Sequence, residues 1–222
     1  MFEGKYSKLL TGLLIAGIVA IIGGLIVLGV NVARNNAINT DASEAVEQFQ
    51  GSKNKNNNTN TASTNSEAVN PLIGIDNLVV GNNSSTSTRQ MYKGFPMVGT
   101  IEIPSIDLKY PVLENASKSA IEVAVAVYDG VGLNQVGNTT IVGHNYRNGT
   151  FFSNLKKVTI GDKVYITDES GKKMTYIVYN TVITTPEDSS FLERDTEGKR
   201  EITLDTCTDD TQSRLLVLAR EE

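Results

Sequence analysis

Apolar residues form one long run near the N-terminus of this 222-residue chain. The run LLTGLLIAGIVAIIGGLIVLGVNV, residues 9–32, contains no charged side chain. A helix rises about 1.5 Å per residue, so the run can cross a hydrocarbon core of about 30 Å. We therefore expect a transmembrane helix over residues 9–32. A cleaved signal peptide is the alternative, but its apolar part is typically only about 7 to 15 residues long.

The charges that flank this run indicate its orientation. Lys5 and Lys8 precede it, whereas Arg34 is followed by Asp41 and Glu44. Positive charge favours the cytoplasmic side of a membrane span. We expect residues 1–8 in the cytoplasm and the remainder of the chain outside the membrane.

A polar segment follows the apolar run. The stretch GSKNKNNNTNTASTNS, residues 51–66, has too little apolar surface to offset the entropy of folding. We expect a flexible extracellular stalk over residues 33–92. Two less polar islands interrupt it: residues 41–50 are compatible with a short helix, and residues 71–80 could dock on the folded domain.

Residues 93–222 show the short, alternating apolar patterns of a mainly β domain. Seven segments are rich in β-branched residues and are bounded by Gly, Pro or Asp. These predicted strands are residues 100–103, 108–114, 138–144, 163–168, 173–185, 200–207 and 214–220. Two further segments, residues 116–128 and 150–158, have a helical pattern. Many short strands in one domain favour a sandwich or a barrel.

The alternation in REITLDTC, residues 200–207, predicts how the last two strands pair. Ile202 and Leu204 share one face, and Cys207 lies on the opposite, polar face. A symmetric antiparallel hairpin through TDDTQS would place Cys207 opposite Arg214, with Cβ atoms about 5 Å apart. The same register pairs Leu204 with Val217 and Ile202 with Ala219, whereas a slip by one residue would spoil the apolar face.

Charge and composition exclude several kinds of site. The net charge of −5 argues against nucleic acid as a partner, because such binding needs an excess of positive charge. Cys207 is the only cysteine, so the chain can form neither an internal disulfide nor a cysteine-rich zinc site. Cys207 is therefore an inert packed thiol, an intermolecular crosslink or a nucleophile.

His144, the only histidine, is the other residue that points to chemistry. It ends a predicted strand, where catalytic groups are often displayed, although a lone histidine can equally be a tolerated surface or core residue. At pH 7 only about 3% of unperturbed thiols are ionised, so a cysteine nucleophile needs activation. A neighbouring arginine would raise the thiolate share and could stabilise an oxyanion.

Three blocks of sequence resemble the sortases, the membrane-anchored cysteine transpeptidases of Gram-positive bacteria. GTIEIPSIDLKYPVLE resembles the opening strands of that family, and GNTTIVGHNYRNGTFFSNLKKVTIGDKVYI resembles its histidine block. EITLDTC followed by RLLVLAR is similar to its TLxTC and arginine block. The resemblance implies a closed eight-stranded β-barrel over residues 93–222, with the long run at residues 173–185 able to supply the eighth strand.

The resemblance also implies a role for each candidate site residue. Cys207 would be the nucleophile, His144 the general acid and base, and Arg214 the group that holds the substrate and steadies the oxyanion. Thr206 would line the substrate groove. No cofactor is implied, and we assign no metal, because scattered acids such as those of residues 186–199 are usually solvated.

A sortase-like enzyme would cleave a Leu-Pro-x-Thr-Gly type signal at the C-terminus of secreted surface proteins. It would then transfer those proteins to a peptidoglycan precursor or another cell-wall amine. The implied location is the bacterial cell membrane, with a single span, a cytoplasmic N-terminus and an extracellular catalytic domain. We expect single proteins to be anchored rather than pilins to be polymerised, because the last strand ends close to Glu222 and no Asp-Pro-aromatic lid precedes Phe95.

Two questions remain open from the sequence. The GHN motif and the N-terminal anchor resemble class B sortases, but the spacing of Cys207 and Arg214 is tighter than in many members, and the Gly-x-Gly-His pattern is absent. The rival functions are a cysteine hydrolase with the same three residues and a stalked, non-enzymatic surface-binding domain. A Cys207 that does not react with an alkylating agent would favour the binding domain. Product analysis with and without an added amine distinguishes the hydrolase from a transpeptidase.

Overall fold

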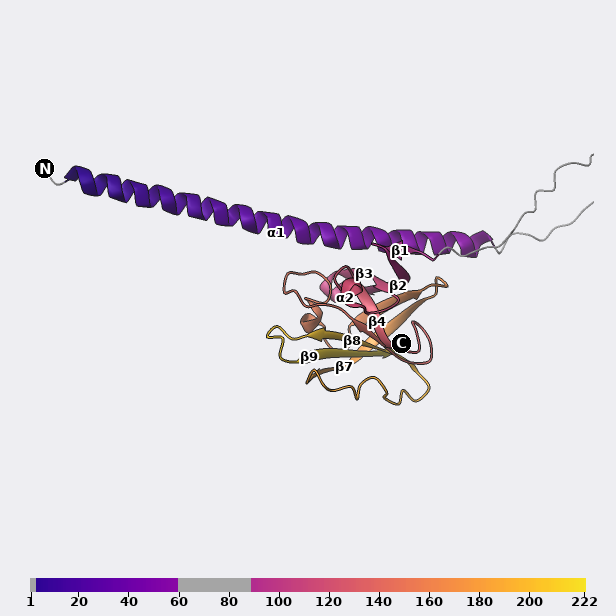
Figure 1. The fold of residues 1–222 in the computed structure, drawn as a ribbon. Coiled ribbons are helices and arrows are strands. Elements are labelled where there is room, and N and C mark those ends of the chain that lie inside the picture. Colours follow the sequence, from indigo (N-terminus) through magenta and orange to yellow (C-terminus); the bar gives the residue numbers. More distant parts are fainter. Residues whose placement is uncertain (1–2, 60–88) are drawn as a thin grey trace, which may run out of the picture.

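The structure, a computed structural model, describes residues 3–59 and 89–222. Its first element is helix α1, Glu3–Thr59, which contains the apolar run and continues beyond it. Among the described residues, α1 is the one helix that is long and apolar enough to cross a membrane. Figure 1 shows α1 extending far past the rest of the protein on its N-terminal side.

The continuation of α1 differs from the flexible stalk expected to begin at residue 33. A stripe of apolar side chains recurs at helical spacing beyond the apolar run and packs against the folded domain: Ile38, Ala42, Ala45, Val46 and Phe49. This packing stabilises a helix that the polar composition alone would not. The short helix expected over residues 41–50 is therefore present, as part of α1. Residues 60–88, with the apolar island at 71–80, lie outside the described residues.

Nine strands follow in the described part of the chain. Their bounds are β1 Met91–Tyr92, β2 Phe95–Ile103, β3 Leu108–Leu113, β4 Val125–Gly130, β5 Gly137–Val142, β6 Lys163–Asp168, β7 Lys173–Thr184, β8 Arg200–Cys207 and β9 Arg214–Glu221. The strand order is β1-β2-β3-β4-β5-β8-β9-β7-β6, and β2 also pairs with β6. Strands β2 to β9 thus close into an eight-stranded barrel, which confirms the expected fold. Pairs β3–β4 and β5–β8 are parallel, and the other pairs are antiparallel.

The helical predictions for the domain are largely wrong. Within residues 116–128 only α2, Lys118–Ile121, is helical, and its N-cap Ser117 accepts a hydrogen bond from the Ala120 amide at 3.2 Å. The β-branched end of that segment becomes β4 instead, between β3 and β5. Strand β4 therefore supplies the eighth strand of the barrel, whereas residues 173–184 form the single strand β7. Residues 150–158 form turns and the short 3₁₀ helix η2, Leu155–Lys157.

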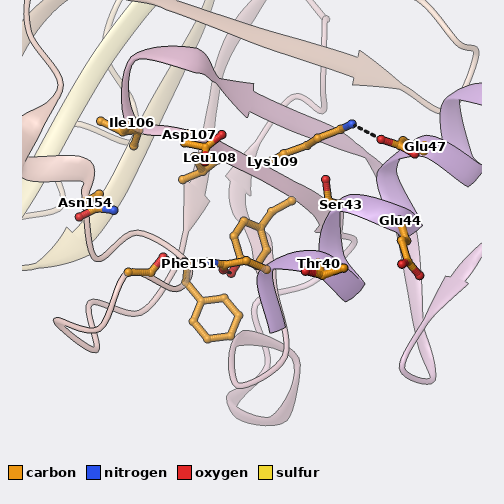
Figure 2. A pocket seen from close by; sticks show the side chains of 13 residues that line it. Thr40, Ser43, Glu44, Glu47, Ile106, Asp107, Leu108, Lys109, Phe151 and Asn154 are labelled. Atoms are coloured by element: carbon orange, nitrogen blue, oxygen red, sulfur yellow. Dashed lines mark hydrogen bonds and ion pairs between the residues drawn. The ribbon is translucent and has the colours of Figure 1, made fainter. Parts of the chain in front are cut away.

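Helix α1 is joined to the barrel by polar contacts beside its apolar stripe. Lys109 of β3 forms an ion pair with Glu47 at 3.1 Å, and the Tyr110 hydroxyl donates a hydrogen bond to Asn39. Figure 2 shows the ion pair at the edge of a pocket of about 380 Å³, which lies between α1 and the segment from the 3₁₀ helix η1, Pro104–Ile106, into β3. The second half of α1 is therefore part of the folded domain.

We expect Phe49→Ala to lower the free energy of unfolding by about 3 kcal/mol, because Phe49 is 1% exposed where α1 meets the barrel. Thermal unfolding of the full chain in detergent measures the change. Gln48→Ala, on the exposed side of the same turn, serves as the control and should leave the transition unchanged. Equal melting temperatures for the two variants would contradict the docking of α1.

Candidate active site

Strand β8 is hydrogen-bonded along both edges, and its partners bring the candidate residues together. It runs parallel to β5 and antiparallel to β9. In the β8–β9 pair, Cys207 lies opposite Arg214, Leu204 opposite Val217 and Ile202 opposite Ala219. The register predicted from alternation is therefore confirmed.

The end of β5 brings His144 to the same place. Val142 is paired with Asp205, and the Gly143 amide donates to the Asp205 carbonyl at 3.2 Å. One residue beyond His144, the Asn145 side-chain amide donates to the Cys207 carbonyl at 3.0 Å. Because His144 lies between two residues that are bonded to the end of β8, it lies at the same end of the barrel as Cys207.

Thr206 strengthens this junction. It is 2% exposed, and its hydroxyl donates to the Gly143 carbonyl at 2.7 Å. The side chain of Thr206 thus joins β8 to the chain that leads into His144. The place of Thr206 in the substrate groove, which the resemblance implied, stays a prediction.

Cys207 itself is partly exposed and is the free thiol at the end of β8. It lies at a pocket of about 590 Å³ whose lining is both apolar and charged. The apolar part comes from Val182 and Ile183 of β7 and from Leu215 of β9, and Lys156 and Asp209 contribute opposite charges. The pocket gives a ligand direct access to the thiol.

His144 is held by a small group of side chains. Its ring lies 4.8 Å from the ring of Tyr146, whose hydroxyl donates to Glu122 at 2.6 Å. Burial and the Glu122 carboxylate raise the pKa of Tyr146 to about 12, so this hydroxyl stays protonated as a donor. The other oxygen of Glu122 is 3.7 Å from His144 Nε2, a buried nitrogen with no hydrogen-bond partner among the described residues. Glu122 is thus the nearest charged group to this nitrogen.

Arg214 is held by a carboxylate that the sequence analysis did not single out. Its Nε donates to Asp205 Oδ1 at 2.8 Å, and its Nη2 pairs with Asp205 Oδ2. Asp205 is 1% exposed, and this hydrogen bonding is the chief reason that the pKa of Arg214 is raised. Asp205 lies two residues before Cys207 and diagonally across from Arg214, so the predicted register contained the signal for this pair.

A second buried carboxylate lies further along the same face of β8. Glu201 accepts hydrogen bonds from Arg220, Arg194 and Tyr179 at 2.6, 2.8 and 2.9 Å. Burial acts to raise the pKa of Glu201, but these hydrogen bonds outweigh it and the pKa is lowered. The polar face of β8 is therefore an enclosed row of paired side chains.

The described residues contain no group of three or more His, Cys, Asp or Glu side chains that could hold a metal ion. Two acids of the segment between β7 and β8, Asp188 and Asp195, have local partners. Asp188, for example, accepts hydrogen bonds from Thr184 and Ser190.

The sortase domain family matches residues 101–222, which include every barrel strand from β3 to β9 and all three candidate residues. The match covers more than half of the chain, and the chain belongs to the sortase family.

Individual relatives agree with this assignment. Sortase A of Bacillus anthracis is 34% identical over 113 residues, which are 50% of this chain and 52% of that protein. Sortase A of Listeria monocytogenes is 26% identical over 200 residues, covering 90% of this chain and 85% of its own length. The chain thus spans about half of the first relative, 52%. The resemblance to class B stays a prediction.

Solved structures of two sortase types are also similar. A lid mutant of sortase A from Corynebacterium diphtheriae has 32% identity and a TM-score of 0.53, over 58% of this chain and 71% of that one. Sortase C1 from Streptococcus suis has 29% identity and a TM-score of 0.52, over 57% and 73% of the two chains.

The lowered pKa of Glu201 predicts a loss of stability in acid. Its carboxylate stabilises the fold fully above its ordinary pKa of 4.5, and this contribution is lost as the pH falls through the lower folded-state value. We expect Glu201→Gln to cost about 3 kcal/mol at neutral pH, because two arginines lose their charged partner. The free energy of unfolding of this variant should also fall less steeply in acid than that of the unaltered protein, as unfolding measured across pH would show.

Glu193→Gln, at an exposed position in the segment before β8, is the control for that experiment. It should leave both the stability at neutral pH and its acid dependence unchanged. If both variants lost stability in acid as the unaltered protein does, Glu201 would not be a source of the acid dependence.

Proposed function

We propose that the protein is a cysteine transpeptidase that cleaves a Leu-Pro-x-Thr-Gly type signal and joins the released surface protein to a cell-wall amine. The observation that carries the proposal is the strand register, which brings His144, Cys207 and Arg214 to one end of the barrel, where Cys207 lines an open pocket. Membership of the sortase family supports the same chemistry.

In the first half-reaction, the Cys207 thiolate attacks the carbonyl carbon of the threonine in the signal. The tetrahedral intermediate collapses with loss of the glycine amine, to which His144 donates a proton, and a thioester to Cys207 remains. In the second half-reaction, an amine attacks the thioester and transfers a proton to His144. The new amide leaves, and the thiolate is restored.

Arg214 would stabilise the negative oxygen that develops in both tetrahedral intermediates. Asp205 uses the Nε and Nη2 edge of the guanidinium, so the pair fixes the plane of the group, while Nη1 has no hydrogen-bond partner among the described residues. A positioned donor of this kind is worth more than a mobile charge, because it does not reorganise during the reaction. Asp205 thus acts as a positioning residue for Arg214.

The membrane span of α1 would anchor the enzyme, with residues 1–8 in the cytoplasm and the barrel outside. Lys5 and Lys8 before the apolar run support this orientation. An extracellular barrel would meet secreted surface proteins and cell-wall amines on the same side of the membrane.

We expect Cys207→Ala to abolish thioester formation and to lower signal-peptide cleavage by on the order of 10⁴-fold or more, since the nucleophile is lost. Mass spectrometry of the protein after incubation with sorting-signal peptides detects both events. The fold should persist because Cys207 lies at the end of its strand, and Gln212→Ala in the exposed hairpin should retain activity.

The same peptide assay tests the proposal against its rivals. Product joined to an added amine identifies a transpeptidase, and only free acid in the presence of that amine would identify a hydrolase. A Cys207→Ala protein that still cleaved peptides would refute the nucleophile, and an alkylation-inert thiol in a protein without activity would favour a binding domain.

The Arg214→Lys variant should cleave a signal peptide more slowly by on the order of 10²-fold, although the positive charge is kept. A lysine cannot hold Asp205 with two parallel hydrogen bonds and present a fixed donor to the oxyanion. Steady-state kinetics with a signal peptide measures this loss.

Arg220→Lys is a matched control, because Arg220 also pairs with a buried carboxylate of β8, Glu201, but lies at the other end of the strand pair. Thermal unfolding of both variants corrects for any difference in stability. If the two substitutions reduced the rate equally, Arg214 would have no special part in the reaction.

A further inference from the structure

The second half of α1 fixes where the barrel lies along the helix axis. No glycine or proline occurs between residues 30 and 50, so the apolar run leads into the docked segment without a hinge. Ala42, Val46 and Phe49 are at most 1% exposed, and the Lys109–Glu47 ion pair lies beside them (Figure 2). The orientation of the barrel relative to the apolar run is therefore set by contacts within this chain.

Different ends of the barrel meet different parts of α1. The side chains of Asn35 and Asn39 donate to the carbonyls of Asn148 and Gly149 at 3.2 and 3.3 Å. These partners belong to the loop that follows His144. Towards the other end of the docked segment, Gln90 donates to Ser52 at 2.6 Å.

The loop bonded to Asn35 lies at the end of the barrel that carries Cys207. Strands β5 and β8 are parallel, so the residues that follow them share one end with the β8–β9 hairpin, residues 208–213. The turn between β6 and β7 lies at the opposite end, where Arg89 bonds Glu169 at 2.8 Å next to Gln90. Figure 1 agrees, because the C-terminus, where β9 ends, lies away from the N-terminus of α1.

The rise of the α1 helix gives the distance of each contact from the end of the apolar run. The apolar run ends at residue 32, so Asn35 lies only about 4.5 Å further along the axis, whereas Ser52 lies about 30 Å further. When residues 9–32 span a bilayer, the loop after His144 lies at the level of the lipid headgroups. The far end of the barrel stands about 30 Å away from them.

We propose that α1 seats the barrel on the phospholipid surface with its Cys207 end towards the lipid, so that residues 145–149 and 208–213 form a membrane-facing surface. Side chains at this end suit a bilayer interface: Tyr146 is 40% and Ile183 69% exposed, and Arg147 is exposed beside them. The pocket beside Cys207 would then receive chain segments presented at headgroup depth. The proposal rests on the proposed anchoring by α1 and is independent of the catalytic roles.

Two single-cysteine proteins test the orientation. Gln212→Cys in the β8–β9 hairpin and Ser170→Cys in the β6–β7 turn are both made in a Cys207→Ser background, because Cys207 is the only native cysteine. Each full-length protein is labelled with an environment-sensitive fluorophore and reconstituted in vesicles that contain lipid with a nitroxide on its headgroup. We expect strong quenching of the probe at residue 212 and none at residue 170.

A third protein carries a flexible Gly-Ser insertion between residues 33 and 34 in the Gln212→Cys, Cys207→Ser background. The insertion releases the barrel from the apolar run, so quenching at residue 212 should fall towards that at residue 170. The same insertion in the unaltered chain should leave peptide cleavage in detergent unchanged, because the barrel and the docked half of α1 stay intact.

Each other outcome is decisive. Equal quenching at both positions, no quenching at either, or stronger quenching at residue 170 would overturn the orientation. Failure of the chain to float with vesicles would overturn the anchoring and the orientation together. Quenching as expected in a protein without transpeptidase activity would leave the membrane-facing surface standing and refute the proposed function alone.

Discussion

Strand β8 carries the candidate site because it is paired with a strand on each side, through residues 200–205 with β5 and residues 201–207 with β9. Its parallel partner β5 ends just before His144, and its antiparallel partner β9 begins at Arg214. Both pairings are held in register by apolar side chains that face the barrel interior, among them Ile141, Leu204 and Val217. A slip by one residue would turn these side chains outwards, so burial of the core also fixes the distance between the three site residues.

The other face of β8 is polar, yet it is enclosed. Asp205 and Glu201 are 1% and 2% exposed. Asp205 is paired with one arginine and Glu201 with two, all from neighbouring segments. A buried carboxylate is costly unless it is paired and hydrogen-bonded, so these arginines hold defined positions. The buried Asp205 thereby fixes the plane of the Arg214 guanidinium at the end of β8 where Cys207 is partly exposed. The stability of the sheet is in this way linked to the chemistry proposed at that end.

Much of this arrangement could be predicted from the sequence, because it depends on local periodicity. Alternation predicted the strands that became β3, β5, β6, β7, β8 and β9, and it predicted the β8–β9 register residue by residue. The apolar run at residues 9–32 predicted a helix of membrane-spanning length. Single occurrences of Cys207 and His144 limited the candidates for nucleophile and base, because the chain offers no other thiol or imidazole.

Only the tertiary structure decided the features that depend on distant partners. Residues 125–128, the end of a segment predicted to be helical, became part of a strand because β3 and β5 flank them. The helix continues past residue 33 because the barrel buries its apolar stripe as far as Phe49. Asp205 holds Arg214 because its carboxylate is buried and needs a charged partner. Periodicity is a property of neighbouring residues, so the sequence by itself determined most of the barrel strands and the candidate residues. Pairing and burial depend on the whole chain, and they decided which side chains surround the thiol.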